Sequence, residues 1–134
     1  MLQRDFIVRQ VQQLTRVLAQ VLFHKRADRA DEAQEVLAEG LESVLGHGLA
    51  TLRLLTREEL LAACTTDGLF AGEMAVAVAD LLREDDSAAG RERALWLYEA
   101  ALASGAAVPF DIHTRIASLR TETTLSKPDS PCTE

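Results

Sequence analysis

An apolar stripe near the N-terminus constrains the fold of this chain more than any other feature. Apolar side chains recur there at alternating steps of four and three residues: Ile7, Val11, Leu14, Leu18 and Val21. This spacing places them on one face of an α-helix. Phe6, Val17 and Leu22 widen the stripe beyond a coiled-coil seam. The helix, expected over about residues 2–25, should therefore pack against two neighbours.

The rest of the chain repeats this periodicity between short polar links. Aromatic residues make up only 4% of the 134 residues, so Leu, Val and Ala must build the core, which favours helices over strands. Nothing reads as an alternating strand. Helices are expected at about 28–45, 57–64, 71–85, 90–104 and from Pro109 onward, while residues 49–55 fit either a short helix or an irregular apolar link.

The sequence therefore predicts an all-α protein, a compact helical bundle of five or six helices. We expect one helical domain over residues 1–120. The polar residues 121–134 include two prolines and are expected to form a disordered tail.

Local signals mark several boundaries and contacts. Thr56 and Glu59 have the spacing of a capping box, so a short helix should begin at residue 57. Gly40 lies inside a predicted helix, where glycine costs about 1 kcal/mol relative to alanine. A close approach of another helix would explain this glycine. Asp67-Gly68 predicts a turn.

A small-large-small pattern suggests one repeat-like helical hairpin. Ala94, Tyr98 and Ala101 resemble the second helix of a tetratricopeptide repeat, where small residues let paired helices approach. Leu81 stands where the first helix of that repeat has a leucine. The aromatic and glycine positions of the first helix are not matched, since they hold Val78, Leu82 and Asp85. We expect a partial tetratricopeptide-like hairpin rather than a solenoid, which needs about three units.

The opening Arg4-Asp5-Phe6-Ile7 carries a second resemblance. Together with residues 13–19, 44–46, 56–61, 79–82 and 97–102, it resembles a family of small uncharacterised bacterial proteins. In that family an Arg/Lys-Asp-aromatic-Ile start precedes a long helix. The resemblance covers about residues 2–103 and implies a helical, tetratricopeptide-like fold. It implies no activity, because the family has no established function.

The charge distribution is uneven. Net charge is −7, but residues 1–29 carry six basic and two acidic side chains, a balance of +4, which leaves −11 on the remainder. This acidity argues against nucleic-acid binding. The basic first helix has two interpretations. It packs on the acidic second helix of its own chain, or it pairs with the acidic face of a second copy or with an anionic ligand.

The sequence offers no signal peptide and no apolar run of about 18–20 residues, so we expect a cytoplasmic protein with no membrane association. No catalytic, cofactor-binding or metal-binding residues are predicted. His24, His47 and His113 are far apart, and Cys64 is expected to be a small core residue. Glu84-Asp85-Asp86 is interpreted as a solvated helix end, since consecutive residues point in different directions.

Interaction residues are the remaining candidates. The first helix would dock Phe6 and Ile7 on another subunit, with Val11, Leu14 and Leu18 continuing the surface. Trp96 is either an interaction anchor or a half-buried core residue. We expect a non-enzymatic protein-interaction or self-assembly module, with a homo-oligomer or an unidentified protein as partner. The alternative is an enzyme or metal-dependent protein with a site between helices.

Overall fold

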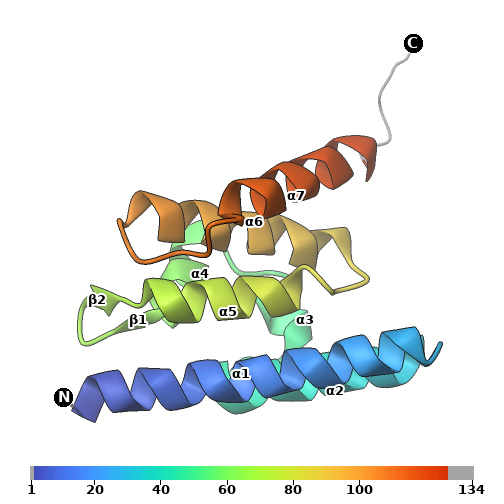
Figure 1. Ribbon diagram of the computed structural model, residues 1–134, viewed down its shortest axis with the longest axis horizontal. Coiled ribbons are helices and arrows are strands. Elements are labelled where there is room, and N and C mark those ends of the chain that lie inside the picture. The colour runs from blue at the N-terminus through green and yellow to red at the C-terminus, as the bar shows by residue number, and fades with distance from the viewer. Residues whose placement is uncertain (1, 127–134) are drawn as a thin grey trace.

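Helices dominate the chain. The computed structural model describes the backbone of residues 2–126 and the side chains of residues 4–121. Its elements, in chain order, are α1 (Leu2–Arg26), α2 (Ala30–Leu45), α3 (Leu49–Leu52), α4 (Arg57–Ala63), β1 (Thr65–Thr66), β2 (Leu69–Phe70), α5 (Gly72–Leu82), α6 (Ala88–Ala103) and α7 (Ile112–Ser126). They stack as layers, with α1 and α2 on one side, α5 next, and α6 and α7 beyond it (Figure 1).

The apolar stripe of α1 packs against two neighbours, α2 and α5, as the sequence predicts. Leu14 and Val21 are buried in the core. Ion pairs join α1 to the two ends of α5: Arg4 Nη1 lies 2.9 Å from Glu73 Oε1, and Lys25 Nζ lies 3.1 Å from Glu84 Oε1. This order of pairing shows that α1 and α5 run in the same direction, whereas α2 runs back along α1.

Helices α1 and α2 approach each other closely at Gly40. A Cβ atom at this position would lie 2.5 Å from Cγ1 of Val17. The predicted close approach at this glycine is therefore confirmed, and the residue that approaches is the β-branched Val17, whose side chain is stiff at χ1.

Alanine at position 40 is expected to lower the free energy of unfolding by about 1–3 kcal/mol, because the added methyl group overpacks against Val17. In an exposed helix the same change would raise stability by about 1 kcal/mol. Urea unfolding of the wild type and of Gly40→Ala shows whether the substitution lowers or raises the free energy of unfolding. In a Val17→Ala background the penalty for Gly40→Ala should disappear. A stabilising Gly40→Ala in the wild-type background would contradict the close approach.

Helix α4 begins, and the link that follows it turns, where the sequence indicates. The capping box is present: the Thr56 side chain accepts from the Glu59 amide at 3.1 Å, and Glu59 Oε1 accepts from the Thr56 amide at 2.9 Å. Asp67 and Gly68 both have positive φ, 53° and 79°. Two such residues form the turn that suits a two-residue β-hairpin. The sequence does not predict the strands themselves, β1 and β2, which pair antiparallel around this turn.

Three further expectations need correction. The structure has seven helices between residues 2 and 126, not five or six, because residues 49–52 form α3. The last helix begins at Ile112 rather than at Pro109, whose carbonyl accepts from the Ile112 amide within a turn. This helix continues to Ser126, so residues 121–126 of the expected tail are helical; the remainder, 127–134, lies outside the described residues.

The small-large-small face of α6 is fully buried. Ala94, Tyr98 and Ala101 all lie in the core, and α6 packs closely against α5. Helix α7 packs against α6. Its apolar residues Ile112, Ile116 and Leu119 are buried, as their spacing predicts. None of the described helices is long and apolar enough to cross a membrane.

Candidate functional site

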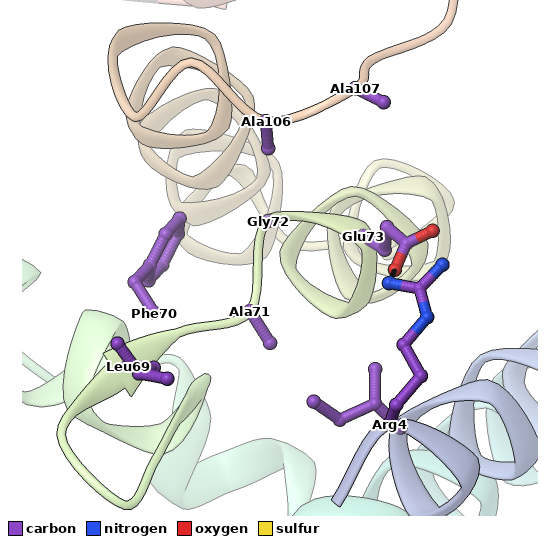
Figure 2. Close-up of a pocket in the computed structure, with 9 residues that line it drawn as sticks. Arg4, Leu69, Phe70, Ala71, Gly72, Glu73, Ala106 and Ala107 are labelled. Carbon is purple, nitrogen blue, oxygen red and sulfur yellow. Dashed lines mark hydrogen bonds and ion pairs between the residues drawn. The ribbon is translucent and has the colours of Figure 1, made fainter. Parts of the chain in front are cut away.

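An open groove lies at the end of the molecule where α1 begins. It has a volume of about 420 Å³ and separates the start of α1 from the β-hairpin, the start of α5 and the link between α6 and α7 (Figure 2). Its apolar lining comes from all four segments: Ile7, Leu69, Phe70, Ala71, Ala106 and Ala107. Residues far apart in sequence therefore form one apolar surface.

A second groove of about 450 Å³ lies between α4, the hairpin and α6. Leu61, Ala100 and Ala103 supply its apolar lining, and Arg57 lies at its rim. Phe70 lines both grooves. The two hollows are therefore neighbours that share this residue.

Glycine holds the first groove in shape. A Cβ atom on Gly72 would lie 2.3 Å from Cβ of Ala106. The start of α5 and the link after α6 thus touch at a point where a side chain does not fit. This contact holds Ala106 against Gly72 at the groove (Figure 2).

Large apolar side chains are exposed in the same segments that build the groove. Leu69 on β2 is 66% exposed and Phe6 on α1 is 50% exposed. Phe110, in the link between α6 and α7, is fully exposed. Of these three residues, Leu69 lines the groove itself, so it adds exposed apolar surface directly to the hollow.

The arginines beside the two grooves differ in how closely they pair with carboxylates. Arg4 pairs with Glu73 at 2.9 Å across the first groove. Arg57, beside the second groove, is 3.8 Å from Glu99, and Glu99 also pairs with Arg120 at 2.6 Å. Within the described part of the chain, the half-exposed Arg57 guanidinium makes only this long contact. It is therefore the rim charge most easily redirected to a ligand.

The acidic run after α5 corrects the interpretation of a solvated helix end. Asp85 is only 2% exposed. Its carboxylate accepts from Arg53 Nε at 2.9 Å, from Arg53 Nη2 at 2.6 Å and from Gln34 Nε2 at 2.6 Å. Burial alone would raise the pKa of Asp85, but these bonds hold the pKa below its ordinary value. Asp85 therefore joins α2, the end of α3 and the α5–α6 link.

A second polar network joins the last three helices. The Tyr98 hydroxyl donates to Asp80 Oδ1, and Arg115 Nη1 donates to the same oxygen at 2.7 Å. Burial, and then the Asp80 carboxylate, raise the pKa of Tyr98 above its ordinary value. Every member of this network has a partner within the protein, so its role is to fix α6 and α7 on α5.

The predicted interaction residues do not form one surface. Ile7 lines the first groove and Phe6, the residue before it, is exposed. Val11 and Leu18 are partly buried against the core, and Leu14 is buried within it. Trp96 is partly buried on α6, with the Arg93 guanidinium 4.6 Å from its ring centre. This position matches the half-buried alternative. Sequence reasoning missed Leu69 and Phe70, although Asp67-Gly68 between them and Thr65-Thr66 is a hairpin signal.

No family model, curated protein or solved structure matches this chain.

The alternative of a metal-dependent protein would require a cluster of suitable ligands. Among the described side chains, no group of three or more His, Cys, Asp and Glu residues is placed to hold a metal ion. Cys64 is buried, as predicted, and burial raises the pKa of its thiol to about 12. A thiol with this pKa is a poor nucleophile at neutral pH.

Proposed function

We propose that this chain is a non-enzymatic helical interaction module that binds an apolar segment of another polypeptide in the grooves around Phe70. The observation that carries the proposal is an apolar hollow built by four segments, with the exposed Leu69 in its lining. A hollow of about 420 Å³ has the size of a site for one or two large side chains.

The two grooves also suggest the chemistry of the partner. One apolar side chain would occupy the space between Ile7 and Phe70, and a second the space between Phe70 and Leu61. An acidic residue of the partner would pair with Arg57, since Glu99 keeps Arg120 when Arg57 turns away. We therefore expect a segment with two apolar anchors and a carboxylate beside the second.

The paired helices α5 and α6 support a tetratricopeptide-like scaffold for this site. They run antiparallel, and the buried Ala94, Tyr98 and Ala101 form the face of α6 in the core. We propose that this pair is a degenerate repeat hairpin, as its sequence pattern suggests. The resemblance to the small bacterial helical family stays a prediction.

Peptide selection tests the proposal. The full-length chain is immobilised and challenged with a displayed library of random peptides, and selected peptides are synthesised and titrated into the protein. We expect sequences with two apolar residues and an acidic residue, which shift the methyl NMR signals of Ile7, Leu69 and Ala106. The Leu69→Glu variant should weaken binding at least about tenfold, the usual loss for an interface anchor.

Leu54→Glu is the matched control, because Leu54 is also an exposed leucine, at 81%, and does not line either groove. It should bind the selected peptides as the wild type does. Selection that yields no binder, or binders that tolerate Leu69→Glu as well as Leu54→Glu, would overturn the proposed function.

A further inference from the structure

The contact between α1 and α2 is made by uncharged side chains. Val17 meets Gly40, Gln13 donates to the Ser43 hydroxyl at 3.0 Å, and Gln10 donates to the Val44 carbonyl at 3.3 Å. The basic helix does pack on the acidic helix, but not through its charges. The packing of α1 on α2 therefore does not explain Arg9 and Arg16 of α1 or Glu35, Glu39 and Glu42 of α2.

These charges lie in two parallel rows on the outer side of the helix pair. Arg9, Arg16 and Phe23 follow one another at steps of seven residues, which keeps them on nearly one face of α1. On α2 the same spacing relates Glu32 to Glu39, and also Glu35 to Glu42. All of these side chains are exposed. Since α5 lies on only one side of the pair, its opposite side is open to solvent (Figure 1).

Most charges of the two rows have no ion-pair partner among the described side chains. Among the described side chains, Arg9 and Arg16 form no ion pair, and neither do Glu35, Glu39 and Glu42. Glu32 pairs with Arg29 at 3.6 Å, both in exposed positions. A basic row and an acidic row thus lie side by side on one surface, and neither row is neutralised by the other.

We infer that this surface pairs with the same surface of a second copy of the chain, with α1 of each copy against α2 of the other. A surface that carries both signs in adjacent rows is complementary to itself under a two-fold rotation. This interface is separate from the grooves, so it goes beyond the proposed function and does not depend on it.

The contacts within the chain set the register. Val17 lies opposite Gly40, so Arg16 stands at the height of Glu39 and Glu42 along the helix pair, within about one helical turn of each. A two-fold axis parallel to the helices preserves this height in the second copy. It therefore places Arg16 of one copy against Glu39 and Glu42 of the other, and places the reciprocal pair symmetrically.

The direction of the axis follows from charge. A two-fold axis across the helices would place α1 on α1 and α2 on α2, with arginine against arginine and glutamate against glutamate. Like charges in direct contact across an interface are strongly unfavourable. The axis parallel to the helices instead brings Arg16 of each copy against Glu39 and Glu42 of the other. Phe23, exposed in the basic row, adds apolar area to this interface.

A charge exchange tests the pairing. In a dimer of Arg16→Glu, the new glutamate would face Glu39 of the other copy. In a dimer of Glu39→Arg, the new arginine would face Arg16 of the other copy. Sedimentation equilibrium at about 0.1 M salt, where screening is moderate, should show a dimer for the wild type. Each variant alone should dimerise at least about tenfold more weakly, since it faces like charge. An equimolar mixture should recover the dimer, because the new glutamate meets the new arginine.

The control is His113→Glu with Thr114→Glu, which changes net charge as Arg16→Glu does but on the exposed surface of α7. It should dimerise like the wild type. The inference is wrong if the wild type stays monomeric up to about 1 mM, the range of weak association, or if the mixture stays as monomeric as its components. Peptide binding at the grooves is measured separately, so either result leaves the proposed function to its own test.

Discussion

Replacing Asp85 with asparagine is expected to lower the free energy of unfolding by about 3 kcal/mol at neutral pH, the lower part of the range for a broken buried ion pair. The carboxylate accepts two bonds from Arg53 and one from Gln34. Asparagine has the same shape, but its amide nitrogen would direct N–H groups toward side chains that are themselves donors. Arg53 then keeps its charge, about a third exposed, without its carboxylate partner. Thermal and urea unfolding measure the loss.

The difference in the free energy of unfolding between the wild type and Asp85→Asn should depend on pH. Because the folded protein holds the pKa of Asp85 below its ordinary value, folding favours the ionised carboxylate. This contribution to stability is complete above the pKa of the unfolded chain and is lost as pH falls through the lower pKa of the folded state. Unfolding measured from neutral to acidic pH should therefore show the wild type losing its advantage over Asp85→Asn.

Asp86→Asn provides the control, since it makes the same chemical change at the next residue, which is exposed. It should change stability by less than about 0.5 kcal/mol. Equal stability of Asp85→Asn and Asp86→Asn would show that the Arg53–Asp85 pair does not hold the α5–α6 link in place.

Much of the fold is predictable because it depends on local periodicity. The stripe from Ile7 to Val21 predicts a long first helix. Because a helix must bury an apolar face as wide as this one, the stripe also predicts that α1 packs against two other helices. The capping box at Thr56 predicts the first residue of α4, Arg57, correctly. Gly40 predicts a close helix contact, since its helix cost is balanced only where a side chain would not fit.

Features that depend on distant partners are not predictable in this way. Asp85 lies in a run of three acids, which by itself indicates a solvated helix end. Its burial depends on Arg53 and Gln34, which precede it by more than thirty residues. The hairpin strands are too short for alternation to be visible, although Asp67-Gly68 gives their turn.

The candidate site also combines features that local sequence predicts with features that depend on distant residues. Phe6 and Ile7 can be identified from the sequence because they begin the stripe of α1. Of the two, Ile7 lines the groove, together with Leu69, Phe70 and Ala106, which the fold brings beside it. Leu14 has the same periodicity but lies in the core. Periodicity identifies the apolar face of a helix, and only the packing shows which part of that face stays open.

Replacing Gly90 with alanine is expected to destabilise the protein by about 3 kcal/mol, as does loss of the Asp85 carboxylate. Gly90 lies in the first turn of α6, where an added Cβ would be 1.9 Å from Oδ2 of Asp85. Either the carboxylate leaves Arg53 or the start of α6 moves away from the core. Alanine in an unobstructed helix would instead stabilise by up to about 1 kcal/mol, so the sign of the change in a urea titration is diagnostic.

The double variant Asp85→Ala/Gly90→Ala separates this cause from a general intolerance of α6. Once the carboxylate is absent, the space it occupied accepts the methyl group added by Gly90→Ala. In the Asp85→Ala background, Gly90→Ala should therefore be neutral or stabilising, and the two single penalties should not add. The coupling energy from the double-mutant cycle should be about 2–3 kcal/mol, as for residues in direct contact. Additive penalties would mean that Gly90 is required for a reason other than its contact with Asp85.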